Sequence, residues 1–382
     1  MNSRCCLLII SGLIFVTACF GLAVADDLIT KELELEELWH LGGEEEDDAL
    51  LEFICSVVRQ DEDIYILDTG ASKIHHYTVD GDSVAIYDIA GSGPGECDHP
   101  NDLLSLGNGY FGLVKGLPAK IIVTDFKDNP QPTIKFHVPT VPDDNPLRVY
   151  AIKIQGDYLG VFSHVMRRGV SLSIFELRDN EYGYPQAYEL ARLLHDTPLV
   201  TNEVPSELDT PYYFNREVWN ISASGQLYVA PYRDRYLINV YNPDGSLTFQ
   251  IEGDYDPCER SYDLMDYYSY RVMGRSLYVE SYEPAIMGVD IVDDQLWLRT
   301  GCSDQQDVYR QYDVYDLQGN FSYKVNLNHR GDGFKDNLVF LGDGLVAIVK
   351  GYYDRQHPGF FSENPHSPIE EDVSQVILCR IK

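Results

Sequence analysis

The stretch DEDIYIL, Asp61 to Leu67, sets the pattern of the whole chain, because a polar turn is followed at once by an apolar strand. The same arrangement recurs as GNGYFGLV, QGDYLGVF, SGQLYVA, DDQLWLR and GDGLVAIV. A short apolar run such as FICSVV precedes most of these turns, so each copy predicts a strand, a tight turn and a second strand. The strand-onset residues of the six copies are Ile64, Tyr110, Tyr158, Leu227, Leu296 and Leu345.

The spacing of the copies indicates a repeat architecture. Successive onset residues are 46, 48, 69, 69 and 49 residues apart, close to the repeat of about 40 to 50 residues expected for propeller blades, with insertions in two of them. A second repeat, in phase with the first, places an aromatic residue four positions before a turn glycine and predicts a further hairpin. Its clearest copies are Tyr77 with Gly81, Tyr241 with Gly245 and Tyr315 with Gly319. We therefore expect four antiparallel strands per unit.

The N-terminal region supplies the last strand. LELEELWHLGGEEEDDALLEF, from Leu33, repeats the layout of SVAIYDIAGSGPGECDHPNDLL, from Ser83, but no complete unit precedes it. We expect Leu33 to Leu41 to be the outermost strand of the last blade, beside an inner strand at Val376 to Ile381. The predicted fold class is all-β: a six-bladed β-propeller with four antiparallel strands per blade, closed by an N-terminal strand.

The glycine-rich segment IAGSGPGECDHPNDL, Ile89 to Leu103, invites comparison with phosphate-binding loops. The dinucleotide fingerprint needs a glycine where Glu96 stands, and a P-loop needs Gly-Lys-Ser or Gly-Lys-Thr. Gly91, Gly93 and Gly95 can adopt positive φ, and Pro94 fixes its own φ. The segment is therefore interpreted as a crossover between blades.

With the sixfold unit, the Asp-Gly hairpins and the GxGPGE crossover quoted above, the chain resembles six-bladed β-propeller proteins of the NHL and TolB-like type. It is most similar to the secreted bacterial group in which a GxGPGE-like segment links blades. The resemblance covers the chain from about Leu33 to its end, and it implies architecture more than chemistry, because this fold hosts binding platforms, lactonases and lyases alike.

The first 25 residues predict an export signal, because Arg4 precedes an apolar stretch followed by small residues. Ala23-Val24-Ala25 suits signal peptidase, whereas Val16-Thr17-Ala18-Cys19 resembles a lipobox that would place a lipid on Cys19. We expect residues 26–382 to form a single propeller domain, exported to the periplasm or the extracellular space, with lipid anchoring through Cys19 as the alternative. No second apolar stretch reaches the roughly 20 residues of a membrane-spanning helix.

The charge balance limits the classes of partner that the protein can bind. The chain has 61 acidic and 29 basic residues, a formal net charge of −32, which opposes binding to nucleic acid. Five cysteines, from Cys55 to Cys379, follow the export signal without a CxxC pair, so they give no zinc signature and leave both disulfides and buried free thiols open. No cofactor is evident and no metal site is assigned, although the channel of such a fold could hold calcium or another divalent metal. We expect a monomer.

Candidate ligand-binding residues form a basic cluster in this acidic chain. Arg148, Arg216 and Lys335 lie ten or eleven residues before their strand-onset anchors, near the start of three innermost strands, which predicts a position around the channel mouth. Guanidinium groups there could hold a carboxylate or sulfate, or simply pair with nearby carboxylates. The same rim is expected to include His99, Asn101, Asp102 and Arg260.

The sequence favours a binding or scaffolding module for a protein, peptide or carbohydrate partner. The alternative is a metal-dependent hydrolase, lactonase or lyase with its site in the central channel, for which no catalytic residue can be assigned. Convergence of three or more oxygen or imidazole ligands on one point of the channel would favour the enzyme.

Overall fold

The computed structural model describes residues 29–43, 51–127, 131–138, 147–165, 169–197, 217–260, 271–272, 275–276, 281–302, 308–352 and 374–382. Every named element in these ranges is a β-strand. The described part of the chain has no helix with the length and apolarity needed to span a bilayer. The export signal predicted at 1–25, Cys19 and Arg216 lie outside the described residues.

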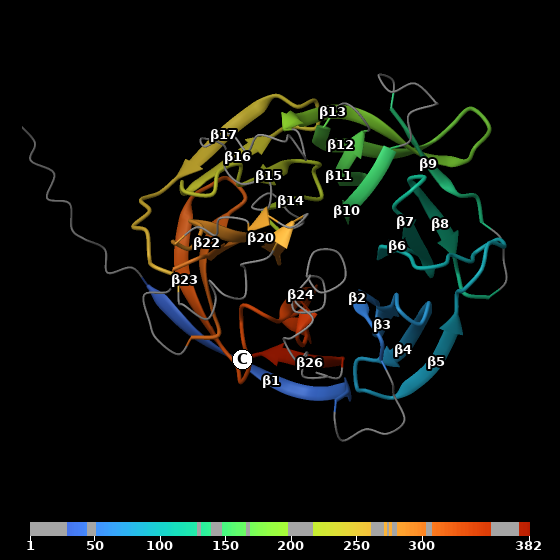
Figure 1. Cartoon of the computed structure of the whole chain (residues 1–382), viewed down its shortest axis with the longest axis horizontal. Coiled ribbons are helices and arrows are strands. Elements are labelled where there is room, and N and C mark those ends of the chain that lie inside the picture. Colours follow the sequence, from blue (N-terminus) through green and yellow to red (C-terminus); the bar gives the residue numbers. More distant parts are fainter. Residues whose placement is uncertain are drawn as a thin grey trace, which may run out of the picture.

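The strands are arranged around a central axis in a propeller-like ring, and they pair antiparallel with their neighbours in sequence (Figure 1). We call a set of consecutive strands that pair in order from the centre outward a run. The first run is β2 (Ile54–Gln60), β3 (Asp63–Asp68), β4 (Lys73–Thr78) and β5 (Ser83–Asp88). The second run is β6 (Asp102–Gly107), β7 (Tyr110–Lys115), β8 (Lys120–Thr124) and β9 (Ile134–His137). The next two are β10 (Leu147–Gln155), β11 (Tyr158–Val165), β12 (Gly169–Asp179) and β13 (Pro185–Thr197), then β14 (Trp219–Ile221), β15 (Leu227–Val229), β16 (Leu237–Tyr241) and β17 (Leu247–Glu252).

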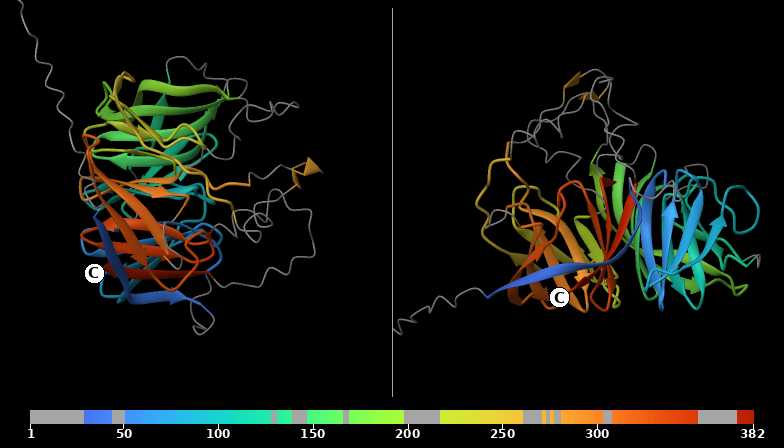
Figure 2. Two further views of the ribbon diagram at one scale, coloured as in Figure 1. Left: turned by 90° about the vertical axis from the view of Figure 1, so that its left-hand side faces the viewer. Right: turned by 90° about the horizontal axis from the view of Figure 1, so that it is seen from below.

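The remaining strands complete the ring. They are β20 (Ile286–Val292), β21 (Gln295–Thr300), β22 (Arg310–Asp316) and β23 (Phe321–Asn328), then β24 (Asn337–Gly342), β25 (Leu345–Val349), β26 (Gln375–Ile381) and β1 (Thr30–Gly42). A short hairpin of β18 (Arg271–Val272) and β19 (Arg275–Ser276) projects beyond one face of the ring (Figure 2).

The N-terminal strand lies beside the C-terminal strand β26, as the sequence predicted. Residues Leu35–Gly42 of β1 pair antiparallel with β26, and residues Thr30–Glu34 pair in parallel with Lys324–Asn328 of β23. The indole nitrogen of Trp39 also donates a hydrogen bond to the carbonyl of Val79, 2.9 Å away. One strand therefore joins the first described residues to the last two runs of the sheet.

The core lies between adjacent runs rather than within one sheet. One cluster packs Val57 and Ile66 of the first run against Ala347 and Leu378 of the last. Another packs Tyr228 and Val240 against residues of β20 and β21. Alternate side chains of a strand point to opposite faces, so each run contributes to two such interfaces.

The GSGPGE segment is a self-contained turn between β5 and β6. Gly91 and Gly95 adopt positive φ, at 138° and 82°, whereas Gly93 does not. The backbone N–H of Gly93 donates to the Glu96 carboxylate at 2.7 Å, and the N–H of Gly91 donates to Asp98 at 2.6 Å. Carboxylates of the loop itself thus occupy these donors, which supports its interpretation as a crossover.

Candidate functional site

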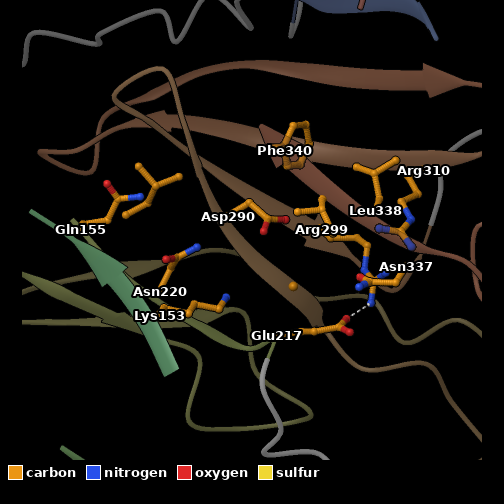
Figure 3. Close-up of a pocket in the computed structure, with 13 residues that line it drawn as sticks. Lys153, Gln155, Glu217, Asn220, Asp290, Arg299, Arg310, Asn337, Leu338 and Phe340 are labelled. Carbon is orange, nitrogen blue, oxygen red and sulfur yellow. Dashed lines mark hydrogen bonds and ion pairs between the residues drawn. The ribbon is translucent and has the colours of Figure 1, made fainter. Parts of the chain in front are cut away.

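An axial cavity of about 210 Å³ lies among the first strands of four successive runs, which face the centre of the ring (Figure 1). Its walls come mainly from β10, β14, β20 and β24, and Figure 3 shows charged side chains of both signs around it. The lining residues are Lys153, Gln155, Glu217, Asn220, Gly288, Asp290, Ile291, Arg299, Arg310, Asn337, Leu338, Val339 and Phe340.

One wall holds an ion pair. The guanidinium of Arg299 donates to the carboxylate of Glu217 at 2.8 Å and to the carbonyl of Met287 at 3.2 Å. Gly288 lies beside it, and a Cβ at this position would stand 3.3 Å from the Cβ of Arg299. The glycine therefore leaves space for the arginine, whose side chain is held in one place by two partners.

A second wall holds a lysine against a buried tryptophan. The ammonium of Lys153 donates to the backbone carbonyl of Trp219 at 2.7 Å and lies 5.3 Å from the centre of its indole ring. The side-chain amide of Asn220 donates to the carbonyl of Val289 at 3.1 Å, which ties β14 to β20. Both polar side chains thus have fixed anchors on the innermost strands.

Arg310 enters the cavity from β22 and is only 7% exposed. Its Nε donates to the carbonyl of Gly333 at 3.1 Å, and a terminal nitrogen donates to the carbonyl of Asp336. These partners are neutral oxygens, so the hydrogen bonds orient the guanidinium without cancelling its charge.

Asp290 is the second acidic group of the cavity. Among the described residues it has no hydrogen-bond or ion-pair partner, although it contributes to the cavity wall. Burial raises the pKa of its carboxyl, and the positive charges of Lys153 and Arg299 oppose this shift without reversing it. The carboxyl is therefore more easily protonated than an ordinary aspartate.

The predicted rim residues that the structure describes are not among the lining residues of this cavity. Arg148 is the second residue of β10, with its guanidinium 5.2 Å from the ring centre of Tyr150. Lys335 stands two residues before β24, in a turn where its backbone N–H donates to the carbonyl of Asp332. Both precede lining residues of the same segments, Lys153 and Asn337.

Three further rim candidates stand where the second run begins. Asp102 is the first residue of β6, and it accepts a hydrogen bond from the N–H of Leu103 at 2.9 Å. His99 adopts a positive φ of 47°, and its Nδ1 is 3.1 Å from the carbonyl of Thr69. Asn101 is exposed immediately before the strand.

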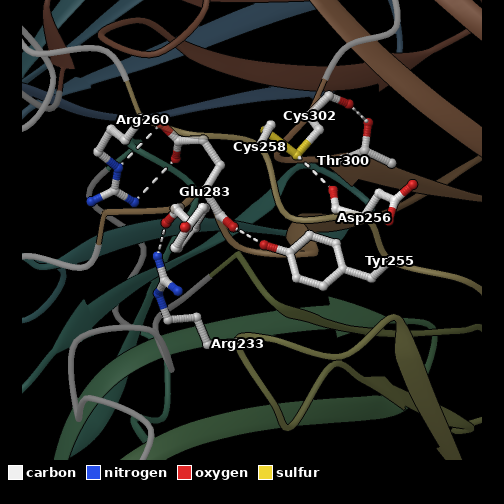
Figure 4. The surroundings of a disulfide bond; sticks show 9 residues. Arg233, Tyr255, Asp256, Cys258, Arg260, Glu283, Thr300 and Cys302 are labelled. Carbon is white, nitrogen blue, oxygen red and sulfur yellow. Dashed lines mark hydrogen bonds and ion pairs between the residues drawn. A yellow bond between two sulfur atoms is a disulfide. The ribbon is translucent and has the colours of Figure 1, made fainter.

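Arg260 belongs to a clamp near the disulfide rather than to the cavity (Figure 4). Its guanidinium donates to both oxygens of Glu283, at 3.1 and 3.0 Å, and both side chains are buried. The hydroxyl of Tyr255 donates to the carbonyl of Glu283, and Cys258 is bonded to Cys302. The clamp ties the two ends of the connection between β17 and β20 together, and the disulfide links that connection to Cys302, two residues after β21.

The donor set of the cavity does not fit a divalent cation. It offers two carboxylates, Glu217 and Asp290, and the side-chain amides of Gln155, Asn220 and Asn337, but three cationic side chains surround them. Glu217 is already paired with Arg299. The described residues also contain no cluster of three or more His, Cys, Asp or Glu side chains placed to hold a metal ion. The chemistry available in the cavity is therefore charge pairing, hydrogen bonding and proton transfer at Asp290.

Comparison with known proteins identifies structural neighbours only. No protein-family model matches the chain, and no curated protein matches its sequence. A member of the DUF4221 family from Bacteroides vulgatus is similar with 8% identity and a TM-score of 0.49, covering 92% of this chain and 98% of that one. Regucalcin, a calcium-binding protein from Agrobacterium tumefaciens, is similar with 10% identity and a TM-score of 0.42, covering 92% of this chain and 96% of that one. Virginiamycin B lyase from Staphylococcus aureus is similar with 11% identity and a TM-score of 0.41, covering 89% of this chain and 99% of that one. At these identities and TM-scores, the likenesses carry no argument about activity or ligand.

Proposed function

We propose that residues 26–382 form one exported six-bladed β-propeller with four strands per blade. The antiparallel runs β2–β5, β6–β9, β10–β13, β14–β17, β20–β23 and β24–β26 with β1 support this division, because each begins near the axis and ends at the periphery (Figure 1). The last blade would then combine strands from both ends of the chain, a closure that leaves no open edge at the junction.

The protein acts as a monomeric binding module, and the axial cavity is where it holds part of a protein, peptide or carbohydrate partner. The observation that carries this proposal is the convergence of Lys153, Glu217, Asp290, Arg299 and Arg310, from separate strands, around one cavity. Buried charges destabilise a fold unless they are paired, so their concentration on the axis is better explained by recognition than by stability.

The predicted rim would form the outer part of the same binding surface, where the innermost strands begin. Arg148 and Lys335 would meet an acidic group of the partner before it reaches the cavity. Arg148→Ala combined with Arg216→Ala should weaken binding of an acidic partner and leave the melting temperature nearly unchanged. A large loss of stability would instead assign the two arginines to structural ion pairs.

The binding proposal is tested by screening the mature protein against peptide and glycan arrays and a metabolite library, with thermal shift as the readout. A ligand of the cavity should lose affinity in Lys153→Met, because one of the three cations is removed. Lys135→Met is the matched control, since Lys135 is exposed on the outer strand β9. Equal affinity in both variants would place the ligand elsewhere, and no ligand in any screen would contradict the proposal.

Export is the remaining part of the proposal. The N-terminal residue of protein purified from the envelope or medium of a producing cell would be Asp26 after cleavage at Ala25, or a lipid-modified Cys19. Mass spectrometry distinguishes the two outcomes directly, and an intact Met1 in the mature protein would contradict export through this signal.

A second candidate is a hydrolase, lactonase or lyase of the channel. The specific observation that favours it is Asp290, whose raised pKa suits a general acid or base. In that case a ligand found by screening would be consumed over time, and Asp290→Asn would abolish turnover while retaining binding. Stable, stoichiometric binding without product would favour the binding module.

A further inference from the structure

The axial cavity contains two charged groups of opposite sign that form no ion pair among the described residues. The carboxyl of Asp290 has no hydrogen-bond or ion-pair partner there, and the guanidinium of Arg310 donates to two backbone carbonyls rather than to a carboxylate. Arg310 is also more than nine-tenths buried. By contrast, Glu217 and Arg299 already neutralise one another.

These two groups constrain the charge of a ligand. A simple anion would satisfy Arg310 but would face the carboxylate of Asp290, and a simple cation would satisfy Asp290 but face three basic side chains. A ligand that carries both charges provides a partner for each group. Charge-assisted hydrogen bonds of this kind are the strong ones in buried sites.

The size and the remaining walls constrain the rest of the ligand. A cavity of about 150 Å³ holds a benzene molecule, so the axial cavity of about 210 Å³ accommodates roughly eight non-hydrogen atoms by the same proportion. Ile291, Leu338, Val339 and Phe340 are also among its lining residues, which provides apolar contact for an uncharged part.

We propose that the axial cavity binds a small zwitterion, an α-amino acid with an apolar side chain, whose ammonium pairs with Asp290 and whose carboxylate pairs with Arg310. This inference rests on the proposed function, because it takes the axial cavity as the ligand site and names the chemistry of its ligand. Lys153 and Arg299 are anchored by their own hydrogen bonds and add positive potential beside the ligand carboxylate.

The pKa of Asp290 agrees with this assignment. The pKa of its carboxyl is raised because burial destabilises the ionised form more than the positive charges of Lys153 and Arg299 stabilise it. The negative charge of Glu217 raises the pKa further, and the positive charge of Arg310 lowers it slightly. A ligand ammonium would supply the missing counter-charge and lower that pKa. Binding should therefore release a proton where Asp290 is partly protonated, a signal that calorimetry in two buffers of different ionisation enthalpy measures.

The test uses two matched triads of probes with the mature protein in isothermal titration calorimetry. The first is L-leucine, 4-methylpentanoate, which lacks the ammonium, and 3-methylbutylamine, which lacks the carboxylate. The second is L-valine with 3-methylbutanoate and 2-methylpropylamine. In at least one triad the amino acid should bind about ten- to hundredfold more tightly than either analogue, because each analogue loses a charge-assisted hydrogen bond.

The variant Asp290→Asn identifies the carboxyl that recognises the ammonium. It should abolish the preference for the amino acid over the carboxylate analogue, and the analogue itself should bind as tightly as before or more tightly, because the repelling carboxylate is gone. Asp294→Asn is the control, since it makes the same charge change on the exposed β20–β21 turn, where asparagine tolerates the positive φ of 59°. The control should keep the preference.

Three results would overturn the inference. Equal binding of the carboxylate analogue and the amino acid would indicate an anion site only, and an unchanged preference in Asp290→Asn would place the ammonium elsewhere. Absence of binding in both triads would also refute it. If another ligand from the screens still bound in a Lys153-dependent manner, only this inference would fail, whereas failure of both would remove the proposed function as well.

Discussion

Deleting residues 29–42 removes β1 and should destabilise the whole ring. Leu35 and Leu41 of this strand are 7% and 4% exposed, in clusters shared with the last two runs and the first. Burial of each leucine side chain contributes about 1.5–3 kcal/mol, and the hydrogen bond from Trp39 to Val79 contributes about 1 kcal/mol more. The loss is thus about 4–7 kcal/mol, a large share of the roughly 5–15 kcal/mol that stabilises a typical domain.

The deletion is measured by urea unfolding, followed by the fluorescence of Trp219 and Trp297, which both variants retain. A synthetic peptide of residues 29–43 should restore stability when added to the truncated protein, and a scrambled peptide should not. Leu41→Ala provides a milder perturbation, with an expected loss of about 2–5 kcal/mol. Because β26 and β23 would lose a partner strand, the truncated protein should also aggregate more readily.

The reasoning fails if the truncated protein unfolds at the urea concentration of the full chain. It also fails if unfolding becomes two separate transitions in which only the β24–β26 run is weakened, because a closed ring should lose stability cooperatively. If the truncated protein were native-like and did not bind the peptide, β1 would be an addition to the sheet that the closed ring does not require.

Three further outcomes are expected. Replacing Cys258 and Cys302 together by serine should lower the free energy of unfolding by about 4 kcal/mol, the chain-entropy value for a loop of this length, since the disulfide spans a separation of 44 residues; an unchanged urea midpoint would contradict it. Asp290→Asn should raise the melting temperature at pH 7 to 8, because the ionised carboxyl is the less stable form in the fold, and the gain should vanish towards pH 4, where the unfolded chain also begins to protonate. A gain that grows on acidification would reverse this sign. Asp68→Ala should cost about 3 kcal/mol or more, measured by urea unfolding, because three backbone N–H groups, those of Glu52, Phe53 and Ala71, donate to this buried carboxylate; a change below 1 kcal/mol would show that water replaces it.

The architecture could be predicted because its signals are local. Tyr110, Tyr158, Leu227 and Leu345 begin strands where the repeat placed them, since a turn followed by apolar residues is visible within a few positions. At Ile64 and Leu296 the observed strands begin one residue earlier, at Asp63 and Gln295. Closure was also predictable, because β1 repeats the layout of an outer strand and its crossover.

The cavity could not be predicted in the same way, because its residues come from distant parts of the chain. Lys153, Glu217 and Asp290 meet only after three runs have been placed around one axis. The sequence pointed instead to Arg148, five residues before Lys153 on β10. A register shift between Val149 and Ala151 changes which side chains face a given direction, and no pattern in the sequence marks that irregularity.

The disulfide was unpredictable for a related reason. Five cysteines follow the export signal, and their spacing does not specify partners. Cys258 follows β17, and Cys302 lies two residues after the end of β21. The two cysteines are 44 residues apart in the sequence, and the fold brings them within bonding distance. The other three, Cys55, Cys97 and Cys379, are buried and belong to no disulfide among the described residues. Burial raises the pKa of Cys379 to about 12, which keeps that thiol protonated and unreactive at neutral pH.

The most direct test of ligand binding on the axis is anomalous diffraction from crystals of the mature protein, grown with ordinary methionine and soaked with L-selenomethionine. This amino acid has an apolar side chain and a selenium atom that reports its position. The account predicts one dominant selenium peak inside the axial cavity, with the ligand ammonium on Asp290 and its carboxylate on Arg310. Peaks only at the outer surface, or an axial cavity with no selenium at a concentration that saturates binding in calorimetry, would contradict it.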